Sequence, residues 1–390
     1  MDQITNPYSP GAGRKPAALV GRDSELERWQ VALRRIESDR GAQSVALYGL
    51  RGVGKTVLLS ELAKMARDRE WLTVRIEAAP GMSLREGLGE ALHAPLADLA
   101  RPSAGRRLLK ALKTAVSFKA SYDTAGSWNF GVDLNTSPGG GADTGTLETD
   151  LRKLISDVAQ AAAEESVGLA ILIDEAQDLN PDELVAVCSI IHAAGQDGLR
   201  LIVALAGLPS LPRILAEARS YSERLFAYVR IEELGDDLAR EAIARPAALE
   251  EVCWDDEALD LVVQSAGGYP YFLQQFGQES WNEAPSAPIT SVDARVGIVR
   301  GQSALDAGFF RARWDRATRG EQKYLRAMAD DGDVGSRAGD VADRLERKVT
   351  SLGPIRANLI AKGLVYAPEH GVVAFTVPGM AGFISRQPTE

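Results

Sequence analysis

The sequence predicts an α/β protein with a parallel sheet, followed by an all-helical domain and a small C-terminal domain of helices and a hairpin. Up to about residue 232, short apolar runs alternate with amphipathic helical patterns, as in repeated βαβ units. From residue 234 the strand patterns stop, and three helical patterns follow. We therefore expect a core over residues 1–232, a helical domain over 233–300 and a C-terminal domain over 301–390.

Five apolar runs in the core have the length and the bounding turns of buried strands. They span residues 44–50, 71–79, 169–176, 199–207 and 226–232. Helical patterns accompany them at residues 19–37, 57–69 and 181–194. Because the first two runs are joined through a helix, they form a βαβ unit and require a parallel sheet.

An insertion interrupts this alternation after the second run. Residues 116–122 and 128–134 alternate apolar and polar side chains, which predicts a β-hairpin. The glycine-rich stretch that continues to residue 146 cannot bury enough apolar surface to order itself, so we expect a mobile loop there. The hairpin is expected to pack on the sheet, and a partner-binding hairpin is the alternative.

The composition is that of a folded soluble protein. The 390 residues include 45% hydrophobic and 25% charged residues, and their number suits two or three domains. Two cysteines and three scattered histidines offer neither a disulfide framework nor a zinc site. This cysteine usage fits a reducing cytoplasm best. No run approaches the roughly 20 apolar residues that span a bilayer, so we expect neither a signal peptide nor a membrane anchor.

The charge is distributed unevenly along the chain. A net charge of −10 argues against a protein that coats nucleic acid over its whole surface. Residues 306–390 nevertheless carry 13 Lys and Arg against 11 Asp and Glu, whereas residues 1–305 carry a net charge of −12. The C-terminal end therefore retains the capacity for a local contact with nucleic acid.

The segment GLRGVGKT, residues 49–56, lies between an expected buried strand and an expected helix. Its glycines allow a tight turn that presents backbone N–H groups to phosphate oxygens at a helix N-terminus. Lys55 is expected to reach the β- and γ-phosphates, and Thr56 to place its hydroxyl on Mg²⁺. The expected nucleotide contacts in this segment are Gly49, Gly52, Val53, Gly54, Lys55 and Thr56.

Two carboxylates follow the third apolar run, at the edge where a parallel sheet binds its ligands. Asp174 is placed to hold Mg²⁺ through water. Glu175 points differently because strand side chains alternate, and it can polarise a water for attack on the γ-phosphate. Together with the glycine-rich segment, this pair predicts hydrolysis of ATP as well as binding.

These motifs resemble those of AAA+ P-loop ATPases, close to the initiator-like (origin-recognition type) and STAND-type bacterial ATPases. The segment LVGRD, which begins at residue 19, resembles the N-terminal box that packs on adenine and so suggests contacts from Val20, Gly21 and Arg22. In such families an arginine just before the fifth strand reaches the γ-phosphate bound to a neighbouring subunit. The segment YSERLF suggests Arg224 for that role, and hence a homo-oligomer. An exposed or salt-bridged arginine without that role is the alternative.

The segment GGYPYF, residues 267–272, resembles the lid motif of STAND ATPases, in which a proline packs on the base or the ribose. It suggests Pro270 and Tyr271 as nucleotide contacts, with an ordinary proline in the first turn of a helix as the alternative. Ala206 and Gly207 stand where AAA+ proteins usually place a polar sensor side chain, and this lid offers no sensor arginine. We therefore expect slow, switch-like hydrolysis.

The C-terminal order of helix, helix, helix and hairpin resembles a winged helix. Helices are expected over residues 318–329, 338–346 and 353–365, with Pro354 at the start of the third and a hairpin that turns at residues 368–371. If the third helix is a recognition helix, its polar side chains face a DNA groove and the preceding basic pair contacts phosphates. The candidate DNA contacts are Arg356, Asn358 and Lys362 for the groove, and Arg347 and Lys348 for phosphates.

Two main hypotheses for function follow from the sequence. The first is a DNA-associated ATPase that binds ATP and Mg²⁺ between core and lid and whose nucleotide state controls assembly on duplex DNA. The second is a STAND-like signalling or defence switch, in which the winged helix contacts a protein or braces the lid. A bare ATP-binding module of a larger complex is a third hypothesis. The expected partners are thus ATP and ADP, duplex DNA, further copies of the chain or another protein.

Overall fold

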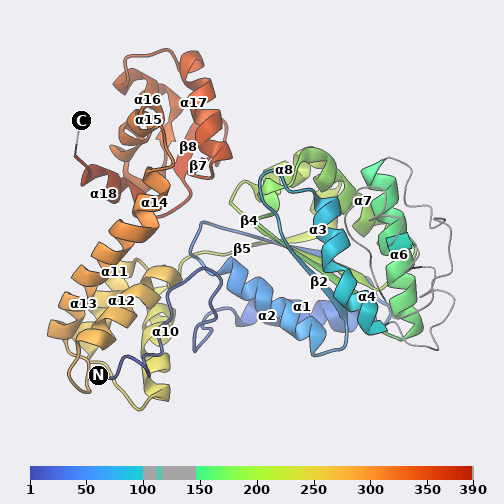
Figure 1. Ribbon diagram of the computed structural model, residues 1–390, viewed down its shortest axis with the longest axis horizontal. Coiled ribbons are helices and arrows are strands. Elements are labelled where there is room, and N and C mark those ends of the chain that lie inside the picture. The colour runs from blue at the N-terminus through green and yellow to red at the C-terminus, as the bar shows by residue number, and fades with distance from the viewer. Residues whose placement is uncertain (100–110, 112–113, 116–145, 389–390) are drawn as a thin grey trace.

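The computed structural model describes residues 1–99, 111, 114–115 and 146–388 (Figure 1). Its core is a five-stranded parallel sheet in the order β2–β3–β4–β1–β5. The strands are β1 (Ser44–Tyr48), β2 (Leu72–Glu77), β3 (Leu169–Asp174), β4 (Leu201–Gly207) and β5 (Phe226–Arg230). All five expected strands are therefore present. The hairpin and loop expected over residues 116–146 lie, up to residue 145, outside the described residues.

Helices cover both faces of the sheet (Figure 1). On one face lie α1 (Asp23–Glu37) and α2 (Lys55–Arg67). On the other lie α3 (Leu84–Ala91), α4 (His93–Leu99), α6 (Leu147–Glu164), α7 (Pro181–Gln196) and α8 (Leu211–Ala218). The short elements η1 (Ala176–Asp178) and α9 (Ser222–Leu225) follow β3 and precede β5. Burial on both faces explains why β4, and β3 up to its last residue Asp174, are apolar.

The helical domain has one helix more than the sequence predicted. It contains α10 (Asp236–Leu249), α11 (Asp256–Ala266), α12 (Pro270–Glu283) and α13 (Ser291–Ala304). The buried positions of α13 are the small residues Ala294, Gly297 and Gly301, which produce no apolar periodicity in the sequence. Helix α13 continues into η2 (Leu305–Phe310) and α14 (Arg311–Trp314). The boundary expected at residue 300 therefore falls inside a continuous helical segment.

The C-terminal region combines helices with a small antiparallel sheet in the order β6–β8–β7. Its elements are α15 (Arg319–Ala329), η3 (Gly332–Val334), β6 (Ser336–Arg337), α16 (Ala338–Arg344), α17 (Val349–Ala361), β7 (Val365–Tyr366), β8 (Val372–Phe375) and α18 (Met380–Ser385). Pro354 does not start the third helix as expected, because α17 begins five residues earlier and contains the proline.

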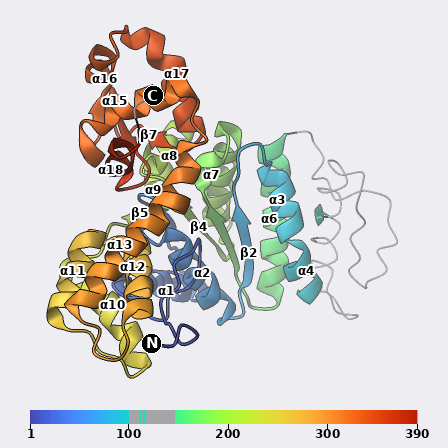
Figure 2. The same cartoon turned by 60° about the vertical axis from the view of Figure 1, so that its left-hand side comes forward.

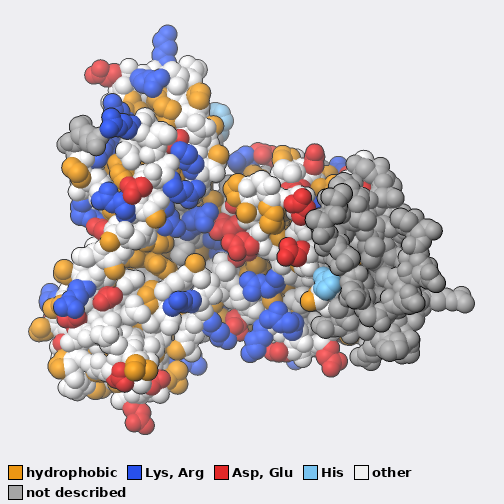
Figure 3. Space-filling model, viewed as in Figure 1, with side chains coloured by type: hydrophobic (Ala, Val, Ile, Leu, Met, Phe, Trp, Pro, Cys, Tyr) orange, Lys and Arg blue, Asp and Glu red, His pale blue; other side chains and the backbone are white. Residues whose placement is uncertain are grey.

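The core, the helical domain and the C-terminal region form three lobes of the molecule. Figure 2 shows the C-terminal region stacked above the helical domain, with the core beside both. Lys and Arg side chains gather on the face of the C-terminal region that Figure 3 presents. In the described part of the chain, no helix is both long and apolar enough to cross a bilayer.

The N-terminal segment is anchored in the helical domain through Tyr8. This side chain is 1% exposed, and its hydroxyl donates to the Ile243 carbonyl oxygen at 2.6 Å. The same hydroxyl accepts from the Trp254 indole N–H at 2.9 Å. The Tyr8 ring also lies edge-on to the rings of Trp254 and Trp281. The N-terminal segment therefore packs on the helical domain before the chain crosses to the core at α1.

The substitution Tyr8→Phe should lower the free energy of unfolding of the helical domain by about 1–3 kcal/mol, because it leaves a buried carbonyl and a buried indole N–H without their partner. Urea unfolding followed by tryptophan fluorescence measures this loss, since Trp254 and Trp281 flank the site. Tyr366→Phe is the matched control, because no hydrogen bond of that hydroxyl is found among the described residues. Equal losses in the two variants would contradict the anchoring role.

Candidate functional site

A glycine-rich turn, residues 49–54, joins β1 to α2. Gly52 and Gly54 have φ angles of 91° and 95°, a conformation that only glycine adopts without strain. A Cβ added to Gly49 would lie 2.1 Å from the Ile231 carbonyl oxygen, so no side chain fits there. Helix α2 begins at Lys55, and its first N–H groups lack partners within the helix. The turn thus presents free donors and a positive helix end to an anion.

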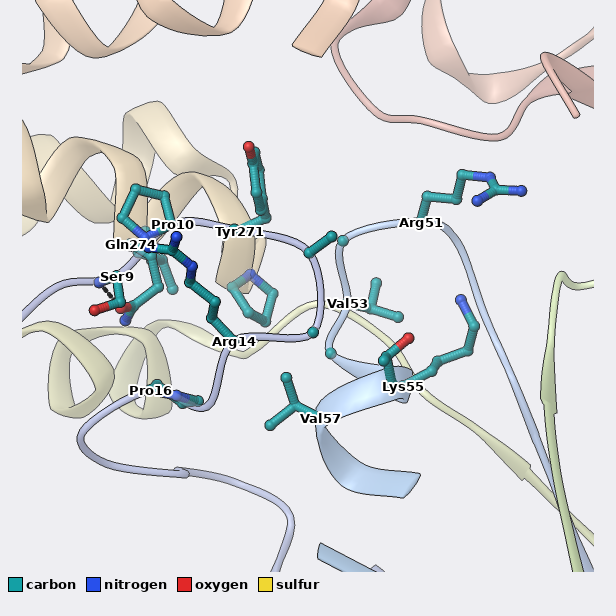
Figure 4. A pocket seen from close by; sticks show the side chains of 18 of the residues that line it. Ser9, Pro10, Arg14, Pro16, Arg51, Val53, Lys55, Val57, Tyr271 and Gln274 are labelled. Carbon is teal, nitrogen blue, oxygen red and sulfur yellow. Dashed lines mark hydrogen bonds between the residues drawn. The ribbon is translucent and has the colours of Figure 1, made fainter. Parts of the chain in front are cut away.

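A cavity of about 430 Å³ lies beside this turn, a volume typical of a small-molecule site (Figure 4). Three parts of the chain supply most of its lining: the N-terminal segment, the glycine-rich turn with the start of α2, and the helical segment from α12 to α14. Glu175 after β3, and Leu234 and Ala242 at α10, complete it. Among the lining residues are Pro10, Arg14, Val20, Arg22, Arg51, Val53, Lys55, Thr56, Glu175, Leu234, Pro270, Tyr271, Phe309 and Arg313. The walls of the cavity are therefore formed by residues that are distant in the sequence.

Lys55 is buried at the base of this cavity, with 7% of its surface exposed. Its Nζ donates to the carbonyl oxygens of Gly49 and Leu50 at 2.9 and 2.8 Å. Burial lowers the pKa of Lys55 to about 8, against the opposing effect of the charges of Glu175 and Asp174. An anion that binds here would therefore stabilise the charged ammonium.

The two expected carboxylates stand where β3 ends. Asp174 is buried, and its Oδ1 accepts from the Glu175 N–H at 2.9 Å. Glu175 has a φ angle of 49°, an unusual conformation for a residue with a side chain. This turn of the backbone directs the Glu175 carboxylate toward the glycine-rich turn, where it lines the cavity.

Both oxygens of the Glu175 carboxylate have partners. Arg51 Nη1 lies 2.8 Å from Oε1 in an ion pair, and Gln177 Nε2 donates to Oε2 at 2.6 Å. Arg51 belongs to the glycine-rich turn, at a position to which the sequence assigned no role. In this conformation the carboxylate that was predicted to activate water is held by protein groups.

Gln177 also places a polar side chain at the end of β4. Ala206 and Gly207 are both buried and carry no polar side chain. The Gln177 Oε1 accepts from the Leu208 N–H at 2.9 Å, and a Cβ added to Gly207 would lie 2.8 Å from that oxygen. The glycine therefore leaves room for an amide that links the ends of β3 and β4. In the sequence Gln177 directly follows the third apolar run, but only the fold brings it to β4.

The box around Val20, Gly21 and Arg22 fastens the N-terminal segment to the turn. Arg22 Nη2 donates to the Val53 carbonyl oxygen at 3.1 Å and to the Glu232 carbonyl oxygen at 2.8 Å. Burial lowers the pKa of Arg22. Val20 and Arg22 line the cavity, whereas Gly21 supports the box from outside with a φ angle of 69°.

Pro270 and Tyr271 open helix α12 and line the cavity. The Tyr271 N–H donates to the Gly52 carbonyl oxygen at 3.3 Å, which ties the helical domain to the glycine-rich turn. The Tyr271 ring stacks on Phe309 with centroids 4.8 Å apart. Pro270 is thus a proline in the first turn of a helix that also lines the cavity, and its contact with a nucleotide stays a prediction.

Arg224 does not belong to this cavity. It is exposed on α9, where its backbone N–H donates to the Tyr221 carbonyl oxygen at 3.0 Å and its carbonyl oxygen accepts from Gln43 Nε2 at 3.1 Å. Within the described residues no ion pair engages its guanidinium. The structure thus leaves Arg224 free at the surface, away from the glycine-rich turn of its own chain.

Two of the candidate DNA contacts have partners inside the C-terminal region. Lys362 Nζ pairs with Glu321 Oε2 at 2.6 Å and donates to the Arg316 carbonyl oxygen at 2.9 Å. Arg356 Nη2 donates to the Val372 carbonyl oxygen of β8 at 3.0 Å. The candidate contacts that remain exposed are Arg347, Lys348 and Asn358.

The C-terminal region touches the glycine-rich turn at Arg51. The Arg51 N–H donates to the Thr376 carbonyl oxygen at 3.0 Å. A Cβ added to Gly363 would lie 3.3 Å from Arg51 Nη2, so the guanidinium also packs on the backbone that precedes β7. Arg51 therefore contacts the C-terminal region and Glu175 at the same time.

Comparisons with known proteins agree with this architecture. Residues 18–205 match the AAA ATPase domain family, and residues 307–384 match a domain of unknown function (DUF8462). The chain matches no protein of curated function. These matches place the ATPase motifs and the C-terminal region in separate families.

Several solved structures are similar to the chain. The Walker-type ATPase PABY2304 of Pyrococcus abyssi is 18% identical, with a TM-score of 0.58 over 94% of this chain and 96% of that one. Cdc6p from Pyrobaculum aerophilum is 12% identical, with a TM-score of 0.47 over 99% and 97%. Orc1 of Aeropyrum pernix, solved in complex with DNA, is 14% identical, with a TM-score of 0.43 over 96% and 94%. At 18% identity the first likeness shows the fold alone. The chain is thus an α/β protein whose core has the fold of an AAA+ P-loop ATPase, and its residues 18–205 match the AAA ATPase domain family.

Proposed function

We propose that the chain binds Mg·ATP in the cavity beside the glycine-rich turn and hydrolyses it slowly, and that the bound nucleotide controls the docking of the C-terminal region. The observation that carries this proposal is the meeting of Lys55, Asp174 and Glu175 at one edge of the sheet, next to free helix N–H groups. A buried ammonium and free amide donors suit phosphate, and paired carboxylates suit a metal and a water.

The residues of the cavity fit a nucleotide and its metal. The amide donors at the start of α2 and Lys55 would hold the phosphates, and apolar side chains such as Val20 and Pro270 would pack on the base. Thr56 and Asp174 offer the oxygen ligands that Mg²⁺ prefers. When bound, the metal neutralises phosphate charge. Glu175 would accept the proton of the attacking water, and Lys55 would keep the phosphates in place.

The contacts of Glu175 support slow, switch-like turnover. While Arg51 and Gln177 hold its carboxylate, each of the two oxygens already has a partner, which leaves fewer acceptor positions for the attacking water. Because Arg51 also binds the Thr376 carbonyl oxygen, release of Glu175 is coupled to the docking of the C-terminal region. This favours the hypothesis of a switch, and the exposed Arg224 is available to complete the site of a neighbouring copy.

Substitution of the central residues tests the ATPase directly. Glu175→Gln should preserve nucleotide binding and lower turnover by roughly 100-fold or more, because it removes the general base. Lys55→Ala should weaken ATP binding by about 1.5–3 kcal/mol because a charged donor is removed. Phosphate release and isothermal titration calorimetry measure the two effects. Turnover of the glutamine variant at the level of the unmodified protein would refute the assignment of the base.

The affinity for Mg·ATP should fall as the pH rises above 8. The pKa of Lys55 is about 8 in the free protein, and contact with phosphate raises it because the charged form is then favoured. Above pH 8 binding must therefore take up a proton, and the affinity falls by at most tenfold per pH unit. Calorimetry in buffers of different ionisation enthalpy measures the uptake. Lys55→Met should bind weakly without this dependence, and a flat profile in the unmodified protein would contradict the assignment.

We also propose, as a second candidate function, that the C-terminal region is a winged helix that contacts duplex DNA. The order α15, β6, α16, α17, β7 and β8 supports the winged helix. The exposed Arg347 and Lys348, at the N-terminus of α17, support the contact with phosphates. Association through these residues would be electrostatic and therefore sensitive to salt.

Charge reversal at the exposed basic pair tests this candidate. Arg347→Glu with Lys348→Glu should weaken binding to duplex DNA, and the salt dependence of log K should fall by roughly 0.9 for each phosphate that the protein no longer neutralises. Fluorescence anisotropy at several salt concentrations provides the measurement. Lys323→Glu, an exposed position on α15, is the matched control. Absent or salt-insensitive DNA binding by the unmodified full chain would reject the DNA candidate and leave the ATPase proposal intact.

A further inference from the structure

Arg313, which lies outside the recognised motifs, also reaches this cavity. Arg313 lies on α14, at the end of the helical segment that leads from α13 into the C-terminal region, and it lines the cavity with Arg51 and Lys55. No sequence motif assigns it a role, because it lies 43 positions after Pro270 and outside every recognised segment. Only the packing of η2 against the start of α12 brings it to the glycine-rich turn.

A stack of aromatic rings fixes the position of Arg313. Its guanidinium carbon lies 4.0 Å from the centroid of the Phe309 ring, and its Nη1 donates to the Phe309 carbonyl oxygen at 2.6 Å. Phe309 stacks on Tyr271, and the Tyr271 N–H bonds to the Gly52 carbonyl oxygen. A continuous series of contacts therefore runs from the glycine-rich turn to Arg313.

Unlike Arg51, Arg313 forms no ion pair with a carboxylate of the described residues. Arg51 pairs with Glu175, and Lys55 and Arg22 donate to backbone carbonyl oxygens. Among the described residues, no carboxylate lies within ion-pair distance of the Arg313 guanidinium. An arginine carries five N–H donors, and the one acceptor found for Arg313 is the Phe309 carbonyl oxygen.

The surroundings of Arg313 disfavour an uncompensated charge. Burial, and then the nearby positive charge of Arg51, lower the pKa of Arg313 to about 10. The side chains of Arg14, Arg22, Arg51, Lys55 and Arg313 line the cavity, and Glu175 is the carboxylate among its described lining residues. A cavity with this excess of positive charge favours a multiply charged anion, and a guanidinium is well suited to bind phosphate oxygens in pairs.

We propose that Arg313 binds the terminal phosphates of the nucleotide and thereby supplies the cation that the lid motif around Pro270 lacks. This inference rests on the proposed function. It places the phosphate contact on the last helix before the C-terminal region, so that region gains different contacts in the ATP-bound and ADP-bound states. A difference of this kind is what allows a ligand to shift a conformational equilibrium.

Nucleotides of different phosphate number test the inference. In the full chain carrying Glu175→Gln, which prevents hydrolysis, Arg313→Gln should raise the Kd for Mg·ATP at least tenfold. The Kd for AMP should change by less than twofold, and the Kd for Mg·ADP should change by an intermediate factor. Isothermal titration calorimetry provides the three values. A decrease in affinity that grows with the number of phosphates supports the contact with the terminal phosphates.

Control variants separate this contact from a packing role. Arg311→Gln removes an exposed arginine from the same helix, one that pairs with Asp315, and should bind all three nucleotides like the parent. Equal weakening of AMP, ADP and ATP by Arg313→Gln, or no weakening at all, would overturn the inference. If the glutamine variant does not fold, Arg313→Lys applies the same criterion, since lysine keeps the charge and removes the fork of donors. A parent that binds none of the three nucleotides would instead reject the proposed function.

Discussion

The ion pair between Arg51 and Glu175 joins the glycine-rich turn to the end of β3, and the backbone of Arg51 links both to the C-terminal region. Arg51 belongs to the glycine-rich turn, Glu175 to the end of β3, and the Arg51 N–H bonds to Thr376 of the C-terminal region. The two side chains of the pair are 29% and 22% exposed, so water and salt screen their attraction. Such a pair contributes about 1 kcal/mol or less. It is therefore strong enough to define a resting arrangement and weak enough for a ligand to break.

The cavity depends equally on contacts between distant segments. Tyr8 anchors the N-terminus in the helical domain, and Arg22 fastens the following residues to Val53 and Glu232. The residues between these two anchors line the cavity. A change in the angle between helical domain and core would therefore have to move this segment as well. Nucleotide binding and the relative position of the two domains are linked through the covalent chain itself.

The sequence was sufficient for the parts of the fold that local patterns determine. Each of the five strands, like the glycine-rich turn, is one continuous stretch of sequence, so apolar runs and glycine spacing identify them. Helix α13 was not predicted because its buried face consists of alanine and glycine, which give no apolar periodicity. The partners of Tyr8 could not be predicted, since they lie 235 and 246 residues away. Lys362 was expected at a DNA groove because a sequence shows its charge but not the buried Glu321 that binds it.

Relative magnitudes indicate how a nucleotide would act on this arrangement. Each hydrogen bond between a charged donor and a phosphate contributes about 1.5–3 kcal/mol, more than the screened pair of Arg51 and Glu175. Phosphates that draw Arg51, Lys55 and Arg313 toward themselves would therefore release Glu175 for water. The same movements would also act on the two links to the C-terminal region. One is the hydrogen bond of the Arg51 N–H to Thr376, and the other is helix α14, which carries Arg313. Hydrolysis at Glu175 and docking of the C-terminal region would then respond to the same nucleotide, because both depend on the same cations.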